Sequence, residues 1–359
     1  MRLIEKVWFQ HHPAQWLMVP LLLPLTAIFA LLSTCRRFAY NLGLFKSIKV
    51  SVPVVVVGNI GIGGNGKTPL TLYLVQQLIE QGVKVGVVSR GYGSKAPYYP
   101  YTVCAESRAE QAGDEPLLIF QRTGVPVVIG ADRIAGCESL ITQGCEIIIA
   151  DDGLQHYRLR RDLELIVVDG KRLFGNGLLL PAGPLRETTA RMNKADYVIV
   201  NGENALTKAL ANITKPILTM SLKATKVINV KTGKVIELET FLAGDIYNSN
   251  KPSSKNVNAI AGIGDPQRFF NTLEQCGFSL DNTKGFIDHQ AFSANDLTRF
   301  SDDVPLLMTE KDAVKCTGFA QDNYWYLPVD ASFVEDDAPS SNESSPIASL
   351  TSAIVALVR

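Results

Sequence analysis

A glycine-rich segment between a β-branched run and an apolar helical pattern constrains the fold of this chain more than any other feature. Residues 52–57 (VPVVVV) predict a buried strand, and residues 69–81 predict a helix. Between them lies a complete G-x-x-x-x-G-K-T motif, formed by Gly61, Ile62, Gly63, Gly64, Asn65, Gly66, Lys67 and Thr68. In such a phosphate loop the backbone N–H groups surround a triphosphate, the lysine reaches its β- and γ-phosphates, and the threonine ligates Mg²⁺. These residues are therefore expected to bind a nucleotide.

The flanking sequence predicts the fold class. Strands are expected at residues 52–57, 83–89, 125–129, 146–150, 163–168 and 197–200, and helices at residues 69–81, 115–121 and 133–142. This alternation is typical of a parallel sheet with crossover helices. We expect residues 36–221 to form a doubly wound α/β domain of the phosphate-loop NTPase type.

A change of pattern near residue 222 indicates a second domain. Residues 226–238 alternate around Thr232-Gly233 as a β-hairpin would, and residues 222–250 are interpreted as a linker. Beyond them a strand-loop-helix unit and further strands at 304–308 and 324–329 predict a smaller α/β domain over residues 251–359. Residues 336–346 are expected to form a loop before a last amphipathic helix.

An apolar segment near the N-terminus indicates a membrane role. Residues 14–34 carry no charge, and residues 16–32 are apolar apart from Thr26. That length is close to the roughly 20 residues that cross a bilayer. Arg36 and Arg37 follow directly, so the positive-inside rule places the rest of the chain in the cytoplasm. Residues 1–35 are therefore expected to form a membrane anchor.

Other interpretations of this segment stay open. Pro20 and Pro24 leave undecided whether it spans the bilayer or lies in one leaflet. A buried helix of a soluble protein is one alternative, although the same prolines would break hydrogen bonds there. A cleaved lipoprotein signal before Cys35 is another, and the bulky Thr34 disfavours it.

The charge balance restricts the partners. Lys and Arg number 35 and so do Asp and Glu, so the basic excess that phosphate-backbone binding requires is missing and no nucleic-acid partner is expected. Six cysteines without a C-x-x-C pair are interpreted as reduced cytosolic thiols. The sequence gives no reason to infer an obligate protein partner.

Two adjacent acids follow the predicted strand at residues 146–150. Asp151 and Asp152 stand where phosphate-loop folds hold Mg²⁺, so both are expected metal ligands. Gln155, within the next turn, is a further metal candidate, and His156 is a candidate contact to metal, phosphate or substrate. The alternatives are that the acids cap a loop and that the histidine is structural.

Several short motifs occur in a fixed order along both predicted domains. In the first they are 58–69 (GNIGIGGNGKTP), 89–93 (SRGYG), 113–116 (GDEP), 151–156 (DDGLQH) and 174–187 (FGNGLLLPAGPLRE). In the second they are 261–270 (AGIGDPQRFF), 288–289 (DH) and 309–315 (TEKDAVK). Together they resemble the tetraacyldisaccharide 4'-kinases of lipid A synthesis, from the apolar segment to about residue 329.

This resemblance implies an ATP- and Mg²⁺-dependent lipid kinase at the cytoplasmic face of the bacterial inner membrane. Members of the family transfer the γ-phosphate of ATP to the 4'-hydroxyl of an acylated glucosamine disaccharide 1-phosphate, which gives lipid IVA. Asp114 is the implied base, with Glu115 beside it, His289 brought over from the second domain, and Lys67 at the transferred phosphate. The expected substrate contacts are Arg90, Tyr92, Glu115, Arg133, His156 and Arg186, because arginines clamp phosphate bidentately.

Two competing functions are also compatible with the sequence. A nucleotide-hydrolysing regulator or transport motor at the membrane would share the phosphate loop and the paired acids. A nucleotide-gated membrane scaffold would share them without catalysis. Asp114 itself precedes Glu115-Pro116, a good helix start, and could serve only as a helix N-cap.

Overall fold

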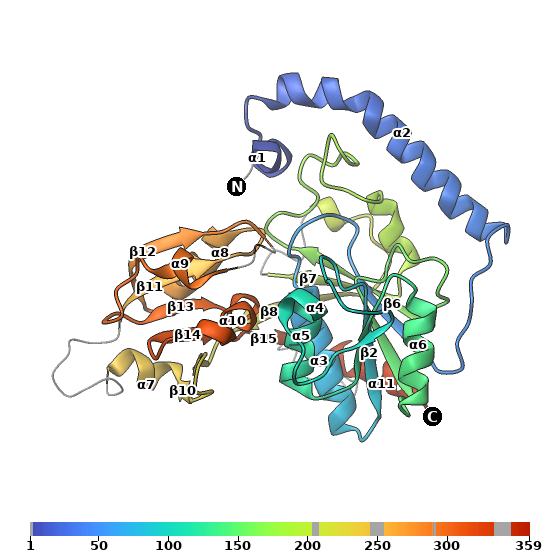
Figure 1. Ribbon diagram of the computed structural model, residues 1–359. Coiled ribbons are helices and arrows are strands. Elements are labelled where there is room, and N and C mark those ends of the chain that lie inside the picture. The colour runs from blue at the N-terminus through green and yellow to red at the C-terminus, as the bar shows by residue number, and fades with distance from the viewer. Residues whose placement is uncertain (1–2, 203–207, 245–254, 289, 291, 334–345) are drawn as a thin grey trace, which may run out of the picture.

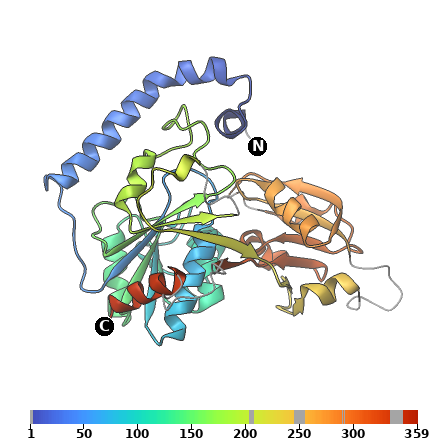
Figure 2. The same ribbon diagram turned by 180° about the vertical axis from the view of Figure 1, so that it is seen from behind.

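The computed structural model describes residues 3–202, 208–244, 255–288, 290, 292–333 and 346–359. In this part of the chain two β-sheets carry helices on their faces, and a long N-terminal helix extends beside them (Figure 1). Figure 2 shows the same arrangement from behind. The α/β class expected from the sequence is confirmed.

The first sheet contains the phosphate-loop strand at its centre. Its order is β15-β8-β7-β6-β1-β5-β2-β4-β3, and only the edge strands β15 and β3 pair antiparallel. The bounds are β1 (Val54–Gly58), β2 (Val85–Ser89), β3 (Tyr101–Thr102), β4 (Val127–Ile129), β5 (Ile147–Asp151), β6 (Leu163–Asp169), β7 (Tyr197–Asn201), β8 (Ile217–Lys223) and β15 (Asp330–Phe333). Val57 of β1 pairs with Asp151 of β5, so the phosphate loop and the paired acids leave the same edge of the sheet.

Helices cover both faces of this sheet, as a doubly wound fold requires. One apolar cluster packs α3 (Lys67–Glu80), α5 (Asp114–Thr123) and α11 (Pro346–Ala356) on one face. A second cluster packs α6 (Arg133–Thr142) and the 3₁₀ helix η1 (Thr189–Lys194) on the other. Val55 and Val57 belong to the first cluster and Val54 and Val56 to the second, because successive residues of a strand face opposite sides. The short helices α4 (Ala109–Ala112) and η2 (Lys208–Leu210) lie in connections.

The second sheet is smaller and mixed. Its order is β10-β9-β14-β13-β11-β12, with bounds β9 (Lys226–Asn229), β10 (Val235–Glu237), β11 (Asn256–Ala261), β12 (Ser279–Gly285), β13 (Leu306–Thr309) and β14 (Tyr324–Leu327). Its helices are α7 (Leu238–Ala243), α8 (Pro266–Gln275), α9 (Ala294–Leu297), α10 (Glu310–Cys316) and η3 (Thr317–Phe319). Large aromatic side chains fill its core, where the rings of Phe241 and Trp325 pack edge to face with centroids 5.1 Å apart.

The expected domain boundaries differ from the observed ones in two places. The hairpin at residues 226–238 forms as expected, but β9 pairs with β14, so the hairpin belongs to the second sheet and is not a separate linker. The C-terminal segment returns to the first domain, because β15 pairs with β8 and α11 buries Leu350 and Ile354 in the first core. Residues 336–345 of the expected loop lie outside the described residues.

The expected apolar segment is helical throughout. After α1 (Leu3–Phe9), helix α2 runs over Gln15–Asn41 and carries Pro20 and Pro24 within it. It is long and apolar enough to cross a membrane by length and composition, and only 6% of its most apolar window is buried. Trp16, Leu17 and Leu21 each expose more than 70% of their surface. Such exposure of large apolar side chains marks an interaction surface.

Candidate active site

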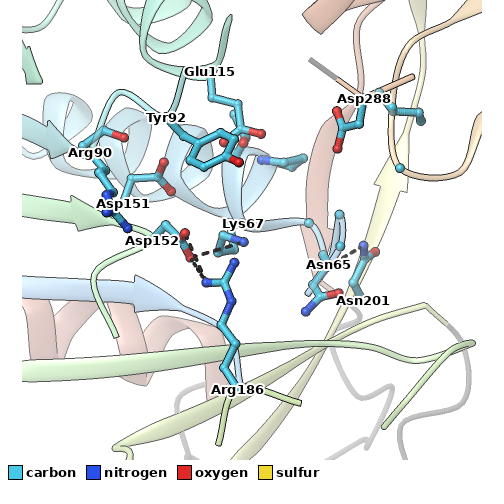
Figure 3. Close-up of a pocket in the computed structure, with 18 of the residues that line it drawn as sticks. Asn65, Lys67, Arg90, Tyr92, Glu115, Asp151, Asp152, Arg186, Asn201 and Asp288 are labelled. Atoms are coloured by element: carbon cyan, nitrogen blue, oxygen red, sulfur yellow. Dashed lines mark hydrogen bonds and ion pairs between the residues drawn. The ribbon is translucent and has the colours of Figure 1, made fainter. Parts of the chain in front are cut away.

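One large cavity gathers most of the expected site residues. Its volume is about 800 Å³, and its walls come from the phosphate loop, α5, the C-terminal half of α2 and the second domain. The residues labelled in Figure 3 all line it, among them Asn65, Lys67, Arg90, Tyr92, Glu115, Asp151, Asp152 and Arg186. Two expected substrate contacts, Arg133 and His156, are not among the lining residues.

The phosphate loop is held in place by an amide from β7. Gly66 has φ +97°, and a Cβ there would meet Asn201 Nδ2 at 2.5 Å, so both conformation and space require glycine. Asn201 Nδ2 donates to the Asn65 carbonyl oxygen at 3.1 Å. Asn201 was not predicted from the sequence, although a polar residue directly after a predicted strand in this fold is a signal for the ligand edge of the sheet.

Lys67 and Arg186 both form ion pairs with the carboxylate of Asp152. Its Nζ is 3.5 Å from Asp152 Oδ1, and Arg186 Nη1 is 3.4 Å from Asp152 Oδ2 (Figure 3). Burial tends to raise the pKa of Asp152, but Lys67 and Arg186 outweigh it and the pKa is lowered. Asp152 is therefore an ionised carboxylate between two cations that point into the cavity.

Asp151 is enclosed at the end of β5. It is 1% exposed, and Thr71 Oγ1 donates to its Oδ1 over a long 3.5 Å. Burial, together with Glu115 and Asp152, raises the pKa of Asp151 to about 7. A buried carboxyl with so little hydrogen bonding fits a position that a cation completes.

The residues present fit Mg²⁺ bound with a nucleotide. Within the described chain, no group of three or more His, Cys, Asp or Glu side chains is arranged to hold a metal. Mg²⁺ usually takes one or two carboxylates together with phosphate oxygens and waters, so a full protein cage is not required. Asp151, Asp152 and Thr68 supply suitable oxygen atoms. Gln155 is otherwise engaged. Its Oε1, the atom that a cation would bind, accepts from Arg186 Nη1 at 3.4 Å, and its Nε2 donates to Asn59 O at 3.1 Å and Glu187 Oε1 at 3.0 Å.

Asp114 is not a helix cap. The N-cap of α5 is Gly113, with φ +84°, and Asp114 is the first helical residue. Its Oδ2 lies 3.3 Å from Lys315 Nζ of the second domain. Next to it Glu115 Oε1 lies 3.0 Å from Lys311 Nζ, which is also 3.2 Å from Asp288 Oδ1. His289 lies outside the described residues, so its expected contact with Asp114 stays a prediction.

The lysines of α10 were not anticipated. Burial would lower the pKa of Lys311, but Glu115 and Asp288 outweigh it and raise the pKa. Lys311 is thus a cation in the wall of the cavity, held between carboxylates of two domains. The spacing of Lys311 and Lys315 places both on one helical face, a signal that the motif TEKDAVK contains.

Arg133 has a supporting role that differs from the expected one. It is 3% exposed, and its Nη1 and Nη2 donate to the carbonyl oxygens of Asp151 and Asp152 at 2.7 and 3.0 Å. It thereby fixes the backbone of the turn that carries Asp151 and Asp152, from the side away from the cavity. Asp152 has φ +47° in this turn, a conformation that needs such support.

His156 is half-buried beside Arg133 and Arg161. Burial and these two cations lower the pKa of His156 to about 4, so the ring is neutral at physiological pH. Its Nε2 is buried and has no hydrogen-bond partner among the described residues. His156 is not among the residues that line the cavity, so the described structure does not show the expected contact of its ring with metal, phosphate or substrate.

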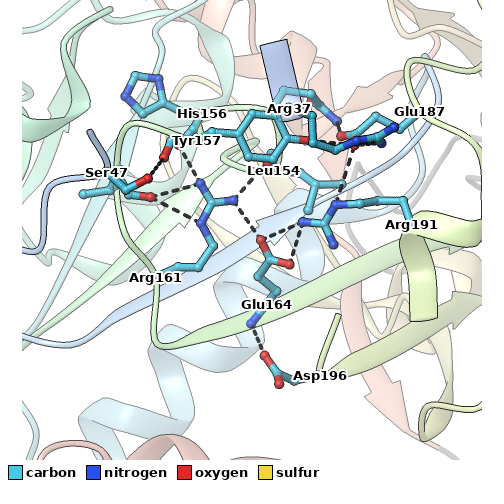
Figure 4. Close-up of polar contacts among 12 residues, drawn as sticks. Arg37, Ser47, Leu154, His156, Tyr157, Arg161, Glu164, Glu187, Arg191 and Asp196 are labelled. Carbon is cyan, nitrogen blue, oxygen red and sulfur yellow. Dashed lines mark hydrogen bonds and ion pairs between the residues drawn. The ribbon is translucent and has the colours of Figure 1, made fainter. Parts of the chain in front are cut away.

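A polar network connects α2 with the cavity (Figure 4). Arg37 Nη1 lies 3.2 Å from Glu187 Oε2, and the Tyr157 hydroxyl donates to the same oxygen at 2.6 Å. Arg191 Nε lies 3.6 Å from the same Glu187 oxygen, and its Nη2 donates to both carboxylate oxygens of Glu164 at 2.8 and 2.6 Å. Glu187 directly follows Arg186 in the chain. The network that holds Glu187 therefore also helps to position the Arg186 side chain in the cavity. From the sequence, Arg37 was expected only to indicate the orientation of the apolar segment in the membrane.

Comparison with known proteins identifies the family. The family model described as tetraacyldisaccharide-1-P 4'-kinase matches residues 18–343. The chain belongs to this family. The resemblance expected from the ordered motifs is confirmed.

Relatives of this kinase family cover nearly the whole chain. A tetraacyldisaccharide 4'-kinase from Colwellia psychrerythraea is 57% identical over 337 residues, which cover 94% of this chain and 95% of that protein. One from Tolumonas auensis is 47% identical over 334 residues, covering 93% and 94%. The crystal structure of LpxK from Aquifex aeolicus in complex with ATP matches with a TM-score of 0.73 and 26% identity, covering 95% of this chain and 100% of that one.

Proposed function

We propose that this kinase transfers the γ-phosphate of ATP to the 4'-hydroxyl of a tetraacyl glucosamine disaccharide 1-phosphate. The proposal rests on one relationship above all. The cavity that contains the phosphate loop is bounded elsewhere by α2, through Phe29, Ser33 and Thr34, and α2 is the apolar helix. A soluble phosphate donor and a lipid acceptor therefore have access to the same space.

ATP would bind along the phosphate loop. The N-terminus of α3 and the loop amides would surround the phosphates, and Lys67 would follow the charge on the transferred group. Bound Mg²⁺, held by Asp151, Asp152 and Thr68, would neutralise charge that develops on the phosphate oxygens. Arg186 would stabilise the same charge from the opposite side of Asp152, since it lies 3.4 Å from that carboxylate.

Asp114 would accept the proton of the sugar hydroxyl. A hydroxyl is a weak nucleophile, so a positioned base helps the in-line attack. Asp114 lies at the first turn of α5 in the cavity wall, and Glu115 and Lys311 adjoin it. His289 would orient Asp114 from the second domain, as the family resemblance implies.

The acyl chains would remain with the membrane. Helix α2 would lie in or across the inner membrane, with Arg36 and Arg37 on its cytoplasmic side. Phe29, Leu179 and Leu180 line the cavity and offer apolar contacts to the lipid. Arg90 and Tyr92 line the wall on the α5 side and would contact the head group.

The deciding experiment measures ATP consumption by the full chain with and without the acylated disaccharide 1-phosphate in detergent. We expect consumption to require the lipid and to match formation of the 4'-phosphorylated product. Turnover without lipid would favour a regulator or transport motor. Binding of ATP without turnover in either condition would favour a membrane scaffold.

A further inference from the structure

Two segments of the form Asp-x-x-Arg, one from each domain, pair reciprocally beside the phosphate loop. Asp169 ends β6 and Arg172 follows it, whereas Asp265 is the N-cap of α8 and Arg268 lies in its first turn. Arg172 Nη2 lies 2.7 Å from Asp265 Oδ2, and Arg268 Nη1 donates to Asp169 Oδ2 at 2.6 Å. Two ion pairs thus connect the same two turns in opposite directions.

Each turn is built so that its acid faces the other domain. Asp169 is 3% exposed, and its Oδ1 accepts the N–H groups of Lys171 and Arg172 at 2.9 and 3.0 Å. Its second oxygen is left for Arg268. Asp265 is the N-cap residue of α8, but its side chain makes no capping hydrogen bond and lies against Arg172 instead. A residue type that commonly caps its own helix is here used across the domain boundary.

Arg172 also adjoins the phosphate loop itself. Its Nη1 is 3.6 Å from the position that a Cβ on Gly63 would occupy, and Gly63 has φ +106°. On another side the guanidinium lies 5.1 Å from the ring centroid of Phe9 in α1. The Arg172 side chain is only 15% exposed. Arg172 therefore contacts α1 and the second domain, and it also adjoins the phosphate loop.

The second domain reaches the loop directly as well. A Cβ on Gly264 would lie 3.9 Å from the backbone nitrogen of Gly64 and 3.7 Å from Asp288 Oδ2. The glycine turn before Asp265 thus packs against the nitrogen that would face a phosphate. Backbone N–H groups bind phosphate well only when they converge beforehand, because ordering them on binding costs affinity.

We propose that the Arg172–Asp265 pair, supported by Arg268–Asp169, is a positioning contact that holds the second domain against the phosphate loop and so sets the affinity for ATP. The contact acts on the loop and not on the lipid acceptor. The inference rests on the proposed binding of ATP at this loop. It assigns the second domain a part in nucleotide binding, in addition to its proposed contribution near Asp114.

The test compares Asp265→Asn with the wild-type full chain in detergent. This change removes a charge and keeps the shape of a side chain that is 32% exposed. We expect the KM for ATP, and the Kd of a non-hydrolysable ATP analogue, to rise roughly fivefold to tenfold. The kcat and the KM for lipid should stay within about twofold. An unchanged Kd, or equal losses for both substrates, would overturn the proposal.

A charge exchange tests the pairing itself. Arg172→Asp and Asp265→Arg should each weaken ATP-analogue binding more than Asp265→Asn does, because like charges then face one another. Combining the two should recover binding relative to either single reversal. If the two losses simply multiply in the double variant, the residues are not coupled and the proposal is wrong.

A second interdomain pair supplies the matched control. Arg122 of α5 contacts Glu310 of α10 at 3.0 Å and also pairs with Asp330, and Arg122 does not line the cavity. Arg122→Gln should leave the Kd of the ATP analogue unchanged. If the Kd of the ATP analogue rises equally in Arg122→Gln and Asp265→Asn, any loosening of the contact between the domains weakens binding. That result would contradict a specific role of Arg172.

The variant Lys67→Ala separates this inference from the proposed function. If Lys67→Ala keeps wild-type turnover, ATP does not act at this loop and both proposals fail. If Lys67→Ala is inactive while Asp265→Asn binds the analogue normally, only the positioning role fails.

Discussion

Lys315 Nζ lies 3.3 Å from Asp114 Oδ2, so a lysine of the second domain holds a carboxylate of the first. The same Nζ is 3.1 Å from Asp312 Oδ1 and 4.8 Å from the Phe292 ring centroid, and the lysine side chain is 4% exposed. A cation enclosed in this way has little freedom to reorient. The direction of Asp114 therefore depends on the contact between α5 and α10.

This dependence leads to the first prediction, on the proposed base. Asp114→Asn and His289→Ala should each lower kcat by about 10²-fold or more, with little effect on ATP binding, because each impairs proton acceptance. The double variant should cost much less than the product of the two losses, since the residues would act as a unit. Steady-state kinetics measures this, with Asp281→Asn as a control on exposed β12. Losses that multiply would show that His289 acts independently.

The second prediction concerns Lys67. Lys67→Ala should reduce lipid phosphorylation by about 10³-fold and leave the fold intact, because the side chain points into the cavity and its charge would stabilise the transferred phosphoryl group. Product formation and circular dichroism are the measurements. Lys84→Ala, a change at an exposed lysine, is the control. Normal turnover in Lys67→Ala would contradict the assignment of the loop.

The third prediction concerns the metal. Asp151→Asn and Asp152→Asn should each weaken the Mg²⁺ dependence or lower turnover by orders of magnitude, because a hard cation loses a charged oxygen ligand. Turnover titrated with Mg²⁺ at saturating ATP distinguishes the two effects. If turnover in both variants depends on Mg²⁺ as it does in the wild type, Asp151 and Asp152 have a structural role and do not bind the metal.

The fourth prediction concerns pH and stability. Burial raises the pKa of Asp151 from 3.8 to about 7, so between about pH 4 and pH 7 the folded protein keeps a proton that the unfolded chain has released. This group therefore destabilises the folded state as the pH rises through that window. Asp151→Asn should raise the free energy of unfolding of the ligand-free protein near pH 8, on the order of a few kcal/mol.

Denaturant unfolding from about pH 4.5 to 8, without nucleotide or metal, checks this. His156 acts with the opposite sign, because its pKa is lowered to about 4 and its contribution grows as the pH rises toward 6.5. Subtracting the free energy of unfolding of Asp151→Asn from that of the wild type at each pH cancels the contribution of His156, because both proteins contain it. Parallel stability curves would mean that Asp151 is already ionised in the folded protein.

The fifth prediction concerns the membrane. Deleting residues up to 33 should release the protein from vesicles and raise the apparent KM for lipid in vesicles far more than that for ATP, because the helix supplies local concentration. Thr26→Val is the control: it removes the hydrogen bond from the Ala182 N–H to Thr26 Oγ1, 3.0 Å long, and keeps the apolar surface. Equal sedimentation of full-length and shortened chains with vesicles would assign α2 to the body of the protein.

The sequence predicts the centre of the first domain well for a physical reason. Strands buried on both faces, such as β1 and β5, require continuous apolar runs that few other elements share. The position of Asp151 and Asp152 follows, because parallel strands end at one edge. By contrast β12 (SLDNTKG) is largely exposed and has no apolar alternation to mark it.

Long-range contacts limit the prediction of the site. The hairpin β9–β10 is recognisable locally, but its partner β14 comes much later in the chain. Arg133 lies next to a predicted helix start, yet only the folded sheet directs its guanidinium to the carbonyl oxygens of Asp151 and Asp152. The spacing of Lys311 and Lys315 predicts that they share a helical face. The sequence does not predict which carboxylates of the first domain they contact, because these contacts form only when the two domains pack together.

The antiparallel pairing of β8 with β15 has a consequence for how the protein can be divided. Lys223 pairs with Asp330 at the point where the chain leaves the first sheet and later returns to it. Partner residues of such a pair lie about 5 Å apart, so the second domain is an insertion whose entry and exit are adjacent. A short turn joining these two positions would close the nucleotide domain as a continuous hairpin and keep α11. Truncation after residue 223 would instead remove β15 and α11 from its core.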